Sequence, residues 1–374
     1  MRVLYYNWVD YRDPEGRGGG VSLYQRNLMT AWAGRDDIEA GFFTAGLSYD
    51  LRRRPPRWEP IRHGPNRGQP HHYDIVNAWP LSPGHHSFGM EAQLSHPGTC
   101  AAVCDMIEQT GPWDVLHLNN LEGLPADMLD AVKARFPAMR VVLSLHNYYP
   151  FCPQVNLWYQ EHATCDDYRD GEACVRCLPH RPDPQLVRAA NAVAYRLKRA
   201  GFVPGTWTFD VAFRWGLDLG RSGARTLARL RAGRRRRTVQ SGPQGGLRGL
   251  TPPGLPFARR RATMVATLNA RCDTVLCVSD AVRRLAVHHG VTPGIARRSY
   301  IGTAQAEAFA TTAPRPVPRD AGAPITLGYL GYMRRDKGFF FLLDALEALP
   351  RSLAVQFRLV VAARRGADET MDRL

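Results

Sequence analysis

Lysine is nearly missing from this chain, and so are long apolar runs. Only Lys133, Lys198 and Lys337 are present, although lysine and arginine together number 49 of 374 residues. The formal net charge of +15 is therefore carried by arginine, and an arginine excess can follow from coding composition alone. No apolar run reaches the roughly 18 residues of a spanning helix, and the first residues lack the pattern of a signal peptide. We expect a cytoplasmic protein.

Part of the arginine excess is clustered between Arg221 and Arg261. Such a cluster fits anionic lipid headgroups, which would suit an enzyme that works on membrane-bound acceptors. A solvated loop explains it equally well. Nucleic acid is not predicted as a partner, because no interleaved aromatic residues or recognised nucleic-acid-binding motif accompany the charge.

The eight cysteines do not predict a disulfide framework in a reducing compartment. Cys100 and Cys104 are spaced i, i+4 in a helical pattern, and Cys272 and Cys277 flank or lie in an apolar strand. We expect these four to be buried thiols.

The remaining cysteines form a cluster with the spacing C-x12-C-x8-C-x2-C. Four thiolates in a reducing compartment favour a structural zinc ion, although two of the spacings are looser than those of a zinc ribbon. Reduced thiols without a metal, or a pair of redox-labile bonds, are the alternatives. Four ligands leave no open coordination position, so no catalytic metal is predicted. The cluster consists of Cys152, Cys165, Cys174 and Cys177.

This cluster follows the stretch around which the chain is organised. Residues 141–145 form a short apolar run typical of a buried strand, and His146 comes where that strand ends. An earlier predicted strand, 113–120, carries His117 and is separated from it by a helical pattern. Chemistry gathers at the carboxyl ends of parallel strands, so the two histidines predict a site at one sheet edge if these two strands are neighbours. Either histidine alone would more simply be structural.

A run of three glycines, Gly18, Gly19 and Gly20, lies between a predicted strand at 2–8 and a predicted helix from about Val21 to Ala33. Backbone amides and a helix N-terminus at such a position can bind phosphate or sugar oxygens. A flexible turn uses the same residues, so the run alone is a weak signal.

Regular patterns elsewhere complete an alternation of strands and helices. The connection 51–97 is poorly patterned, and 179–262 is a basic insertion with helical pieces at 186–200 and 224–237. A Pro/Ala-rich linker at 311–324 precedes a second strand–loop–helix–strand unit. The other predicted segments are strands at 38–46, 74–79, 274–278, 325–330 and 357–363, helices at 97–111 and 128–136, and a helix capped by Ser279 and ended by Gly290.

Several of these segments resemble the family 4 glycosyltransferases of the GT-B fold. WDVLHLNN and LSLHNYYP resemble the family's two histidine strands, and TVLCVS with its helix resembles a strand-Ser-helix-Gly-Val segment. Lys337 and Gly338 match the end of the G-R-L-x-x-x-K-G loop. Tyr332 replaces that loop's arginine, so Arg334 or Arg335 would have to complete the phosphate contacts. The family's Asn-Gly turn is missing at 300–303.

The resemblance implies an α/β, GT-B-like protein with a complete N-terminal Rossmann-like domain (1–310) and the first βαβ of a second, nucleotide-binding domain (325–374). It implies a retaining, hexosyltransferase-type enzyme that transfers a sugar from a nucleotide-diphosphate sugar to a cell-surface polysaccharide or glycolipid. His146 would contact the donor sugar, and Lys337, Gly338 and Arg334 would bind the diphosphate. The glycine run and His117 would line the cleft.

The resemblance covers only part of the second domain. The family's E-x7-E segment, which binds the donor sugar and ribose, has no counterpart here. We therefore expect a truncated chain or one that a partner completes. The alternative function is a non-catalytic, transferase-like protein that binds acceptor or anionic membrane through the basic insertion.

Overall fold

The structure is a computed structural model, and it describes all residues except 161, 179–181, 219–253, 315–323, 364–367 and 374. It divides into two compact units, Met1–Ala304 and Gln305–Leu374. The sequence placed the boundary slightly later, with a linker at 311–324. Most of that linker lies outside the described residues, as do the helix expected at 224–237 and most of the arginine cluster.

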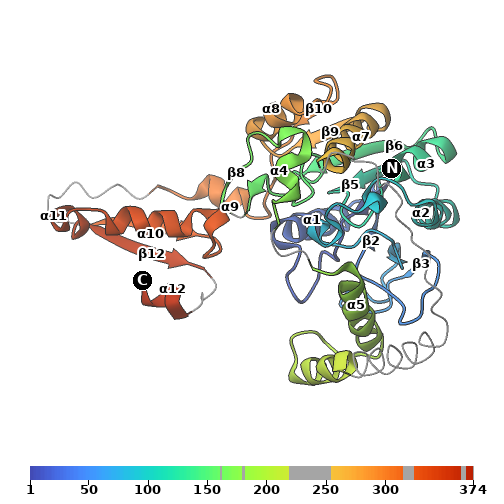
Figure 1. The fold of residues 1–374 in the computed structure, drawn as a ribbon, viewed down its shortest axis with the longest axis horizontal. Coiled ribbons are helices and arrows are strands. Elements are labelled where there is room, and N and C mark those ends of the chain that lie inside the picture. Colours follow the sequence, from blue (N-terminus) through green and yellow to red (C-terminus); the bar gives the residue numbers. More distant parts are fainter. Residues whose placement is uncertain (161, 179–181, 219–253, 315–323, 364–367, 374) are drawn as a thin grey trace, which may run out of the picture. The chain divides into compact units, whose positions relative to one another are not determined.

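The first unit contains an eight-stranded sheet with the order β10-β9-β6-β5-β1-β2-β4-β3 (Figure 1). All neighbouring strands are parallel except β3 and β4. The strands that follow β1 in the chain are added on one side of it, and those that follow β5 are added on the other side of the sheet. The direction of the strand order therefore reverses between β1 and β5. The strands are β1 (Arg2–Tyr6), β2 (Glu39–Ala45), β3 (Arg57–Pro60), β4 (His72–Val76), β5 (Val115–Leu118), β6 (Arg140–Leu145), β9 (Thr274–Cys277) and β10 (Ala296–Arg298).

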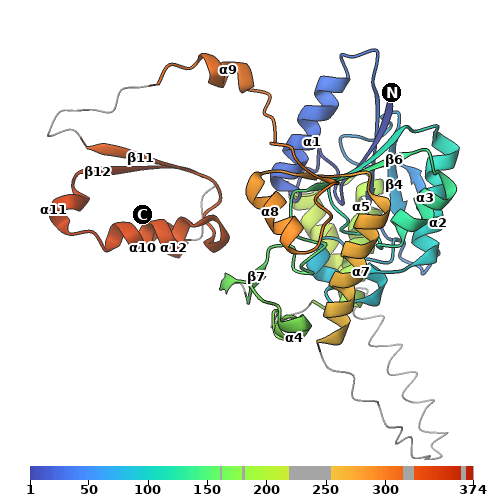
Figure 2. The same ribbon diagram turned by 90° about the horizontal axis from the view of Figure 1, so that it is seen from above.

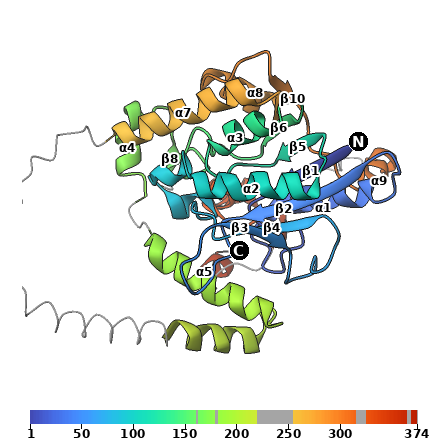
Figure 3. The same cartoon turned by 90° about the vertical axis from the view of Figure 1, so that its right-hand side faces the viewer.

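Helices cover both faces of this sheet (Figure 3). Successive side chains of β1 point to opposite faces, so Leu4 and Tyr6 join the larger apolar cluster while Val3 and Tyr5 join a smaller one. Helix α1 packs against the smaller cluster, whereas α2, α3, α7 and α8 contribute to the larger. The helices are α1 (Gly19–Trp32), α2 (Pro97–Thr110), α3 (Met128–Arg135), α5 (Pro184–Arg199), α7 (Leu255–Arg271) and α8 (Asp280–His288).

Two details differ from the sequence interpretation. The poorly patterned connection contains β3, an edge strand that ends at Pro60, where a missing backbone donor is tolerated. Helix α1 was predicted to bury an apolar stripe that includes Val21 and Tyr24, but its most buried side chains are the polar Ser22 and Gln25. Polar residues face inward there because the N-terminal half of α1 lies beside polar side chains instead of the apolar cluster.

A cysteine-containing loop follows β6 and leads towards α5. It holds a short hairpin of β7 (Trp158–Tyr159) and β8 (Ala163–Thr164), then α4 (Glu172–Val175). Cys174 and Cys177 are buried with Phe88 and Phe257 in a small apolar cluster. The buried positions predicted for Cys100, Cys104, Cys272 and Cys277 are confirmed.

The second unit is a strand–helix–strand motif (Figure 2). Strands β11 (Ile325–Leu330) and β12 (Phe357–Ala362) pair in parallel, with α10 (Phe339–Glu347) and α11 (Arg351–Ala354) between them in the chain. The predicted α/β class is therefore confirmed, with a Rossmann-like sheet in the first unit and a βαβ motif in the second. Within the described residues, no helix has the length and apolar character that crossing a bilayer requires.

Candidate functional site at the sheet switch point

The candidate site lies at the carboxyl edge of the sheet, where the strand order reverses between β1 and β5. Ligands of doubly wound sheets bind at this point, because the diverging connections leave a crevice outside the strand ends. Asn7 follows β1, Asn119 and Asn120 follow β5, and His146 follows β6. Both predicted histidine strands are neighbours in the sheet, as expected.

Asparagine side chains hold the strand ends of this edge together. Asn120 Nδ2 donates to Asn7 Oδ1 at 2.6 Å, and Asn7 Nδ2 donates to the carbonyl of Val9 at 2.9 Å. Asn119 Nδ2 donates to Gln25 Oε1 of α1 at 2.7 Å. These bonds connect the loop after β1 and the first turns of α1 to the loop after β5.

His146 lies beside α1 at this edge. Its ring is 5.1 Å from that of Tyr24. Both ring nitrogens are buried, and neither has a hydrogen-bond partner among the described residues. Burial lowers the pKa of His146 to about 4, so the imidazole is neutral at pH 7. A neutral imidazole both donates and accepts one hydrogen bond, which matches a hydroxyl group.

Other buried polar atoms of α1 and of the loop after β5 also lack partners in the described chain. They are Ser22 Oγ and Gln25 Nε2 of α1 and Asn119 Oδ1 after β5. A buried polar atom without a hydrogen bond costs about 1–3 kcal/mol, so proteins rarely keep several together unless they have a function. The group contains donors and acceptors and no net charge, which is suited to a ligand rich in hydroxyl groups.

His117 has a different environment. It lies within β5, and its Nε2 is 2.8 Å from Ser144 Oγ of β6. Burial, followed by the nearby His146, lowers the pKa of His117 to about 4. Its hydrogen bond across the sheet favours a structural role over the cleft-lining role expected from the resemblance.

Glu122 and Arg260 support the loop that carries His146. Glu122 is fully buried, and it accepts hydrogen bonds from the Gly84 amide at 2.5 Å and from Asn147 Nδ2 at 2.6 Å. Burial raises the pKa of Glu122. Arg260 of α7 donates to the carbonyl of Tyr149 at 2.8 Å, with its guanidinium 4.6 Å from that tyrosine's ring centroid. The loop after His146 is therefore held at Asn147 by Glu122 and at Tyr149 by Arg260.

Sequence reasoning missed most of these neighbours. The residues that it did not single out are Asn7, Ser22, Gln25, Asn119, Asn120, Glu122, Asn147 and Arg260. One signal was available, since NN directly follows β5 and HN directly follows β6. The inward placement of Ser22 and Gln25 carried no such signal, because polar residues on a helix are usually solvent-exposed.

The glycine run forms the start of α1. Gly18 is the N-cap residue, Gly19 has φ +51°, and no side chain caps this terminus within the described chain. A Cβ on Gly18 would overlap Ser22 Oγ and lie 2.8 Å from Val9 Cγ1. Gly18 is thus required for a close approach between the loop and the first turn of α1.

We expect Gly18→Ala to lower the free energy of unfolding by about 1–3 kcal/mol, since overpacking forces neighbouring atoms to move. Gly20→Ala is the matched control, because a Cβ there meets nothing within 4 Å and alanine favours a helix. Urea denaturation of both variants measures the difference. Equal stability of the two variants would contradict the close approach.

The predicted diphosphate residues belong to the second unit. Lys337 ends a short 3-10 helix (Arg335–Lys337) between β11 and α10, and Gly338 follows with φ +72° as the N-cap of α10. Arg334 precedes the same turn. A lysine and a helix N-terminus after a parallel strand form an arrangement that suits a phosphate group.

The four clustered cysteines lie close enough to interact electrostatically. Cys174 interacts electrostatically with Cys152, Cys177 and Cys165, and burial raises its pKa to about 12. Within the described ranges, no three histidine, cysteine or acidic side chains are grouped so that they could hold a metal ion. The structural zinc site therefore stays a prediction, and none of the eight cysteines forms a disulfide.

Comparisons with known proteins found only distant similarity. No protein-family model and no curated protein match the chain. Two structures of Anabaena Alr3699/HepE, one with UDP and one with UDP and glucose, share 12% identity with TM-scores of 0.39 and 0.37. An OtsA apo structure shares 11% identity with a TM-score of 0.39. The alignments cover all of this chain but 64% of HepE and 67% of OtsA. Similarity this distant leaves the function to be inferred from the chain's own residues.

Proposed function

We propose that this chain belongs to a glycosyltransferase that takes a sugar from a nucleotide-diphosphate donor. The observation that carries the proposal is the set of buried, unpaired polar atoms of His146, α1 and the loop after β5 at the switch-point edge of the sheet. These atoms suit the hydroxyl groups of a sugar. The glycine run, Lys337 and the resemblance of both histidine strands to family 4 support the same conclusion.

In the proposed reaction, the protein groups stabilise the charge of the leaving diphosphate or position the donor sugar, and no protein nucleophile is required. Lys337 and the N-terminus of α10 offset the negative charge that develops on the departing diphosphate. His146, as a neutral imidazole, hydrogen-bonds a hydroxyl of the donor sugar and fixes its reacting carbon. We propose a retaining transfer, with a cell-surface polysaccharide or glycolipid as the acceptor.

Nucleotide binding is the first test. We expect isothermal titration calorimetry of the 374-residue chain to detect saturable binding of UDP or GDP, and Lys337→Ala to weaken it about tenfold or more, since a phosphate contact to a charged group is lost. Arg351→Ala is the control, because it removes one positive charge from an exposed position of the same unit. If neither nucleotide binds, or if both variants lose affinity equally, this donor site is wrong.

A second candidate is a non-catalytic protein that contacts an anionic membrane. It is favoured by two tryptophans after α5, Trp207 and Trp215, which are 77% and 70% exposed. Tryptophan is enriched at membrane interfaces, and basic residues such as Arg199 and Arg214 lie in the same region. Salt-sensitive binding to anionic vesicles by a chain that binds neither nucleotide would support this candidate over the transferase.

A further inference from the structure

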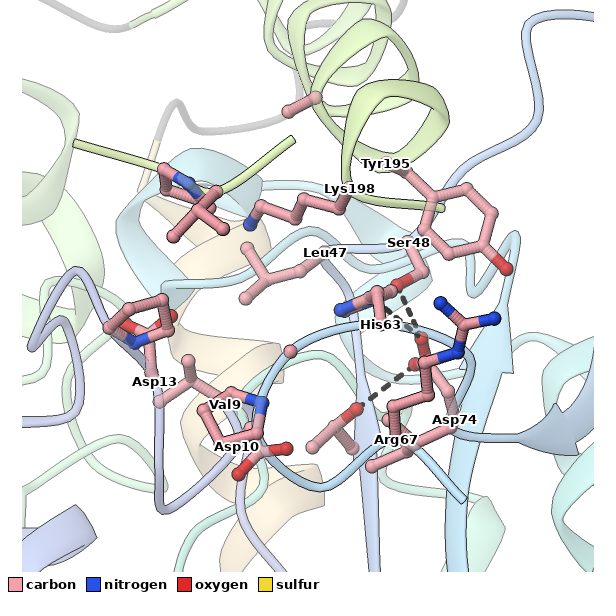
Figure 4. Close-up of a pocket in the computed structure, with 18 of the residues that line it drawn as sticks. Val9, Asp10, Asp13, Leu47, Ser48, His63, Arg67, Asp74, Tyr195 and Lys198 are labelled. Atoms are coloured by element: carbon pink, nitrogen blue, oxygen red, sulfur yellow. Dashed lines mark hydrogen bonds and ion pairs between the residues drawn. The ribbon is translucent and has the colours of Figure 1, made fainter. Parts of the chain in front are cut away.

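A separate cavity of about 330 Å³ lies in the first unit between α5 and the carboxyl ends of β2 and β4 (Figure 4). The loop between β1 and α1 forms a third wall, and the loop between β3 and β4 closes another side. Nothing in the proposed donor site uses this space. It nevertheless shares the β1–α1 loop with that site, since Val9 lines the cavity and also accepts the hydrogen bond of Asn7.

The charges around the cavity balance. Three carboxylates line it, and three cationic side chains stand against them: Asp10, Asp13 and Asp74 against Arg17, Arg67 and Lys198. Arg17 is already paired with Asp13 at 2.7 Å. A charged ligand would therefore find no excess of the opposite sign, whereas an uncharged ligand would keep the balance.

Two buried donor or acceptor atoms of the lining lack hydrogen-bond partners among the described residues. They are Nε2 of His63 and Nδ2 of Asn191 on α5. Burial, followed by nearby cations, lowers the pKa of His63 to about 4, so its ring is neutral at pH 7. Unpaired polar atoms beside a cavity are satisfied when a ligand brings matching groups.

Asp74 supplies acceptors at the base of the cavity. Its carboxylate accepts hydrogen bonds from Thr44 Oγ1 at 3.0 Å and from Ser48, which leaves lone pairs for a further donor. Burial raises the pKa of Asp74 to about 6, so the carboxylate is mostly ionised at pH 7. Figure 4 shows Asp74 on the side of the cavity opposite Lys198 and Tyr195 of α5.

The rest of the lining is apolar. Aliphatic and aromatic side chains come from all sides of the cavity, among them Val9, Leu47, Ile61, Ala194 and Phe202. A pocket of this size lies at the lower end of the usual range of about 300–1,000 Å³, which suits one small ring. An apolar wall combined with uncharged donors and ionised acceptors fits a molecule that has C–H faces and several hydroxyl groups.

We propose that this cavity binds one uncharged sugar residue. That this sugar residue is part of the acceptor rests on the proposed function, but the binding of a sugar in the cavity does not. A uronic acid or a free phosphate is disfavoured by the balanced charge. The pocket would place the bound residue beside the β1–α1 loop, whose other end is the glycine run.

Ligand-observed saturation-transfer NMR on the full chain tests the proposal. The probes are the methyl α-glycosides of glucose, mannose and galactose, with glucuronate and inorganic phosphate as charged probes. We expect at least one glycoside to bind, and Ala194→Phe to abolish its signal because the new ring fills the cavity. Ala189→Phe is the control, since it makes the same change at an exposed position of α5 outside the lining.

The outcomes separate this proposal from the donor site. If no glycoside binds, if only glucuronate or phosphate binds, or if Ala194→Phe binds as well as Ala189→Phe, the pocket proposal is overturned. Nucleotide binding that depends on Lys337 would still support the transferase in that case. Conversely, glycoside binding by a chain that binds no UDP or GDP would retain the sugar pocket and remove the proposed reaction.

Discussion

His146→Phe is expected to slow sugar transfer by about 10² or more while leaving the free energy of unfolding unchanged or higher. The phenyl ring keeps the packing against Tyr24, whose ring centroid is 5.1 Å away. The substitution removes two buried nitrogens that have no hydrogen-bond partner in the described chain. Each such nitrogen lowers the free energy of unfolding by about 1–3 kcal/mol, so its loss does not destabilise the protein. The donor for this assay is a UDP-sugar or a GDP-sugar, whichever nucleotide the chain binds. Release of the nucleotide measures sugar transfer, and urea denaturation measures the free energy of unfolding.

His289→Phe is the control for this result. Burial lowers the pKa of His289 to about 4 as well, and its ring stacks on Phe151 at 4.9 Å, but it lies at the end of α8, away from the switch point. We expect this variant to keep its transfer rate. An equal loss in both variants, or a His146→Phe variant that loses stability together with activity, would show that His146 is only structural.

Arg260→Met is expected to lower the free energy of unfolding by about 3 kcal/mol. Arg260 is 3% exposed and donates to Gln93 Oε1 and to the carbonyls of Tyr149 and Pro150. Methionine fills much of the same volume but provides no donors, so these acceptors become buried and unpaired. Because the carbonyls of Tyr149 and Pro150 belong to the loop after His146, hydrogen exchange at Tyr149 should also become faster.

Arg259→Met is the matched control for this second prediction. The Arg259 side chain is 70% exposed, and it forms an ion pair with Glu91 at 3.6 Å. Exposed pairs contribute little, so a change of less than about 1 kcal/mol is expected in urea denaturation. If the two neighbouring substitutions cost the same, the buried hydrogen bonds of Arg260 do not hold the loop.

Most strands and helices of the first unit could be predicted because their patterns are local. The β-branched run before His146 and the capping Ser279 are examples, and the structure confirms that Ser279 caps α8 by accepting from the Val282 amide at 3.1 Å. Edge strand β3 was missed because its arginine and proline residues give no alternating pattern. The zinc site rests on cysteine spacing and stays a prediction.

The sequence by itself determined the alternation of strands and helices, because hydrophobic periodicity is a local pattern. That His117 and His146 come from one edge of the sheet depended on β5 and β6 being neighbours, and the structure confirms that they are. Only the tertiary structure decided which of the two histidines is paired. It also decided that Ser22 and Gln25 face inward, and that α5 closes a cavity over Asp74. These outcomes depend on contacts between residues that are distant in the chain. A local sequence pattern does not show which polar side chains remain without a hydrogen-bond partner after those contacts form.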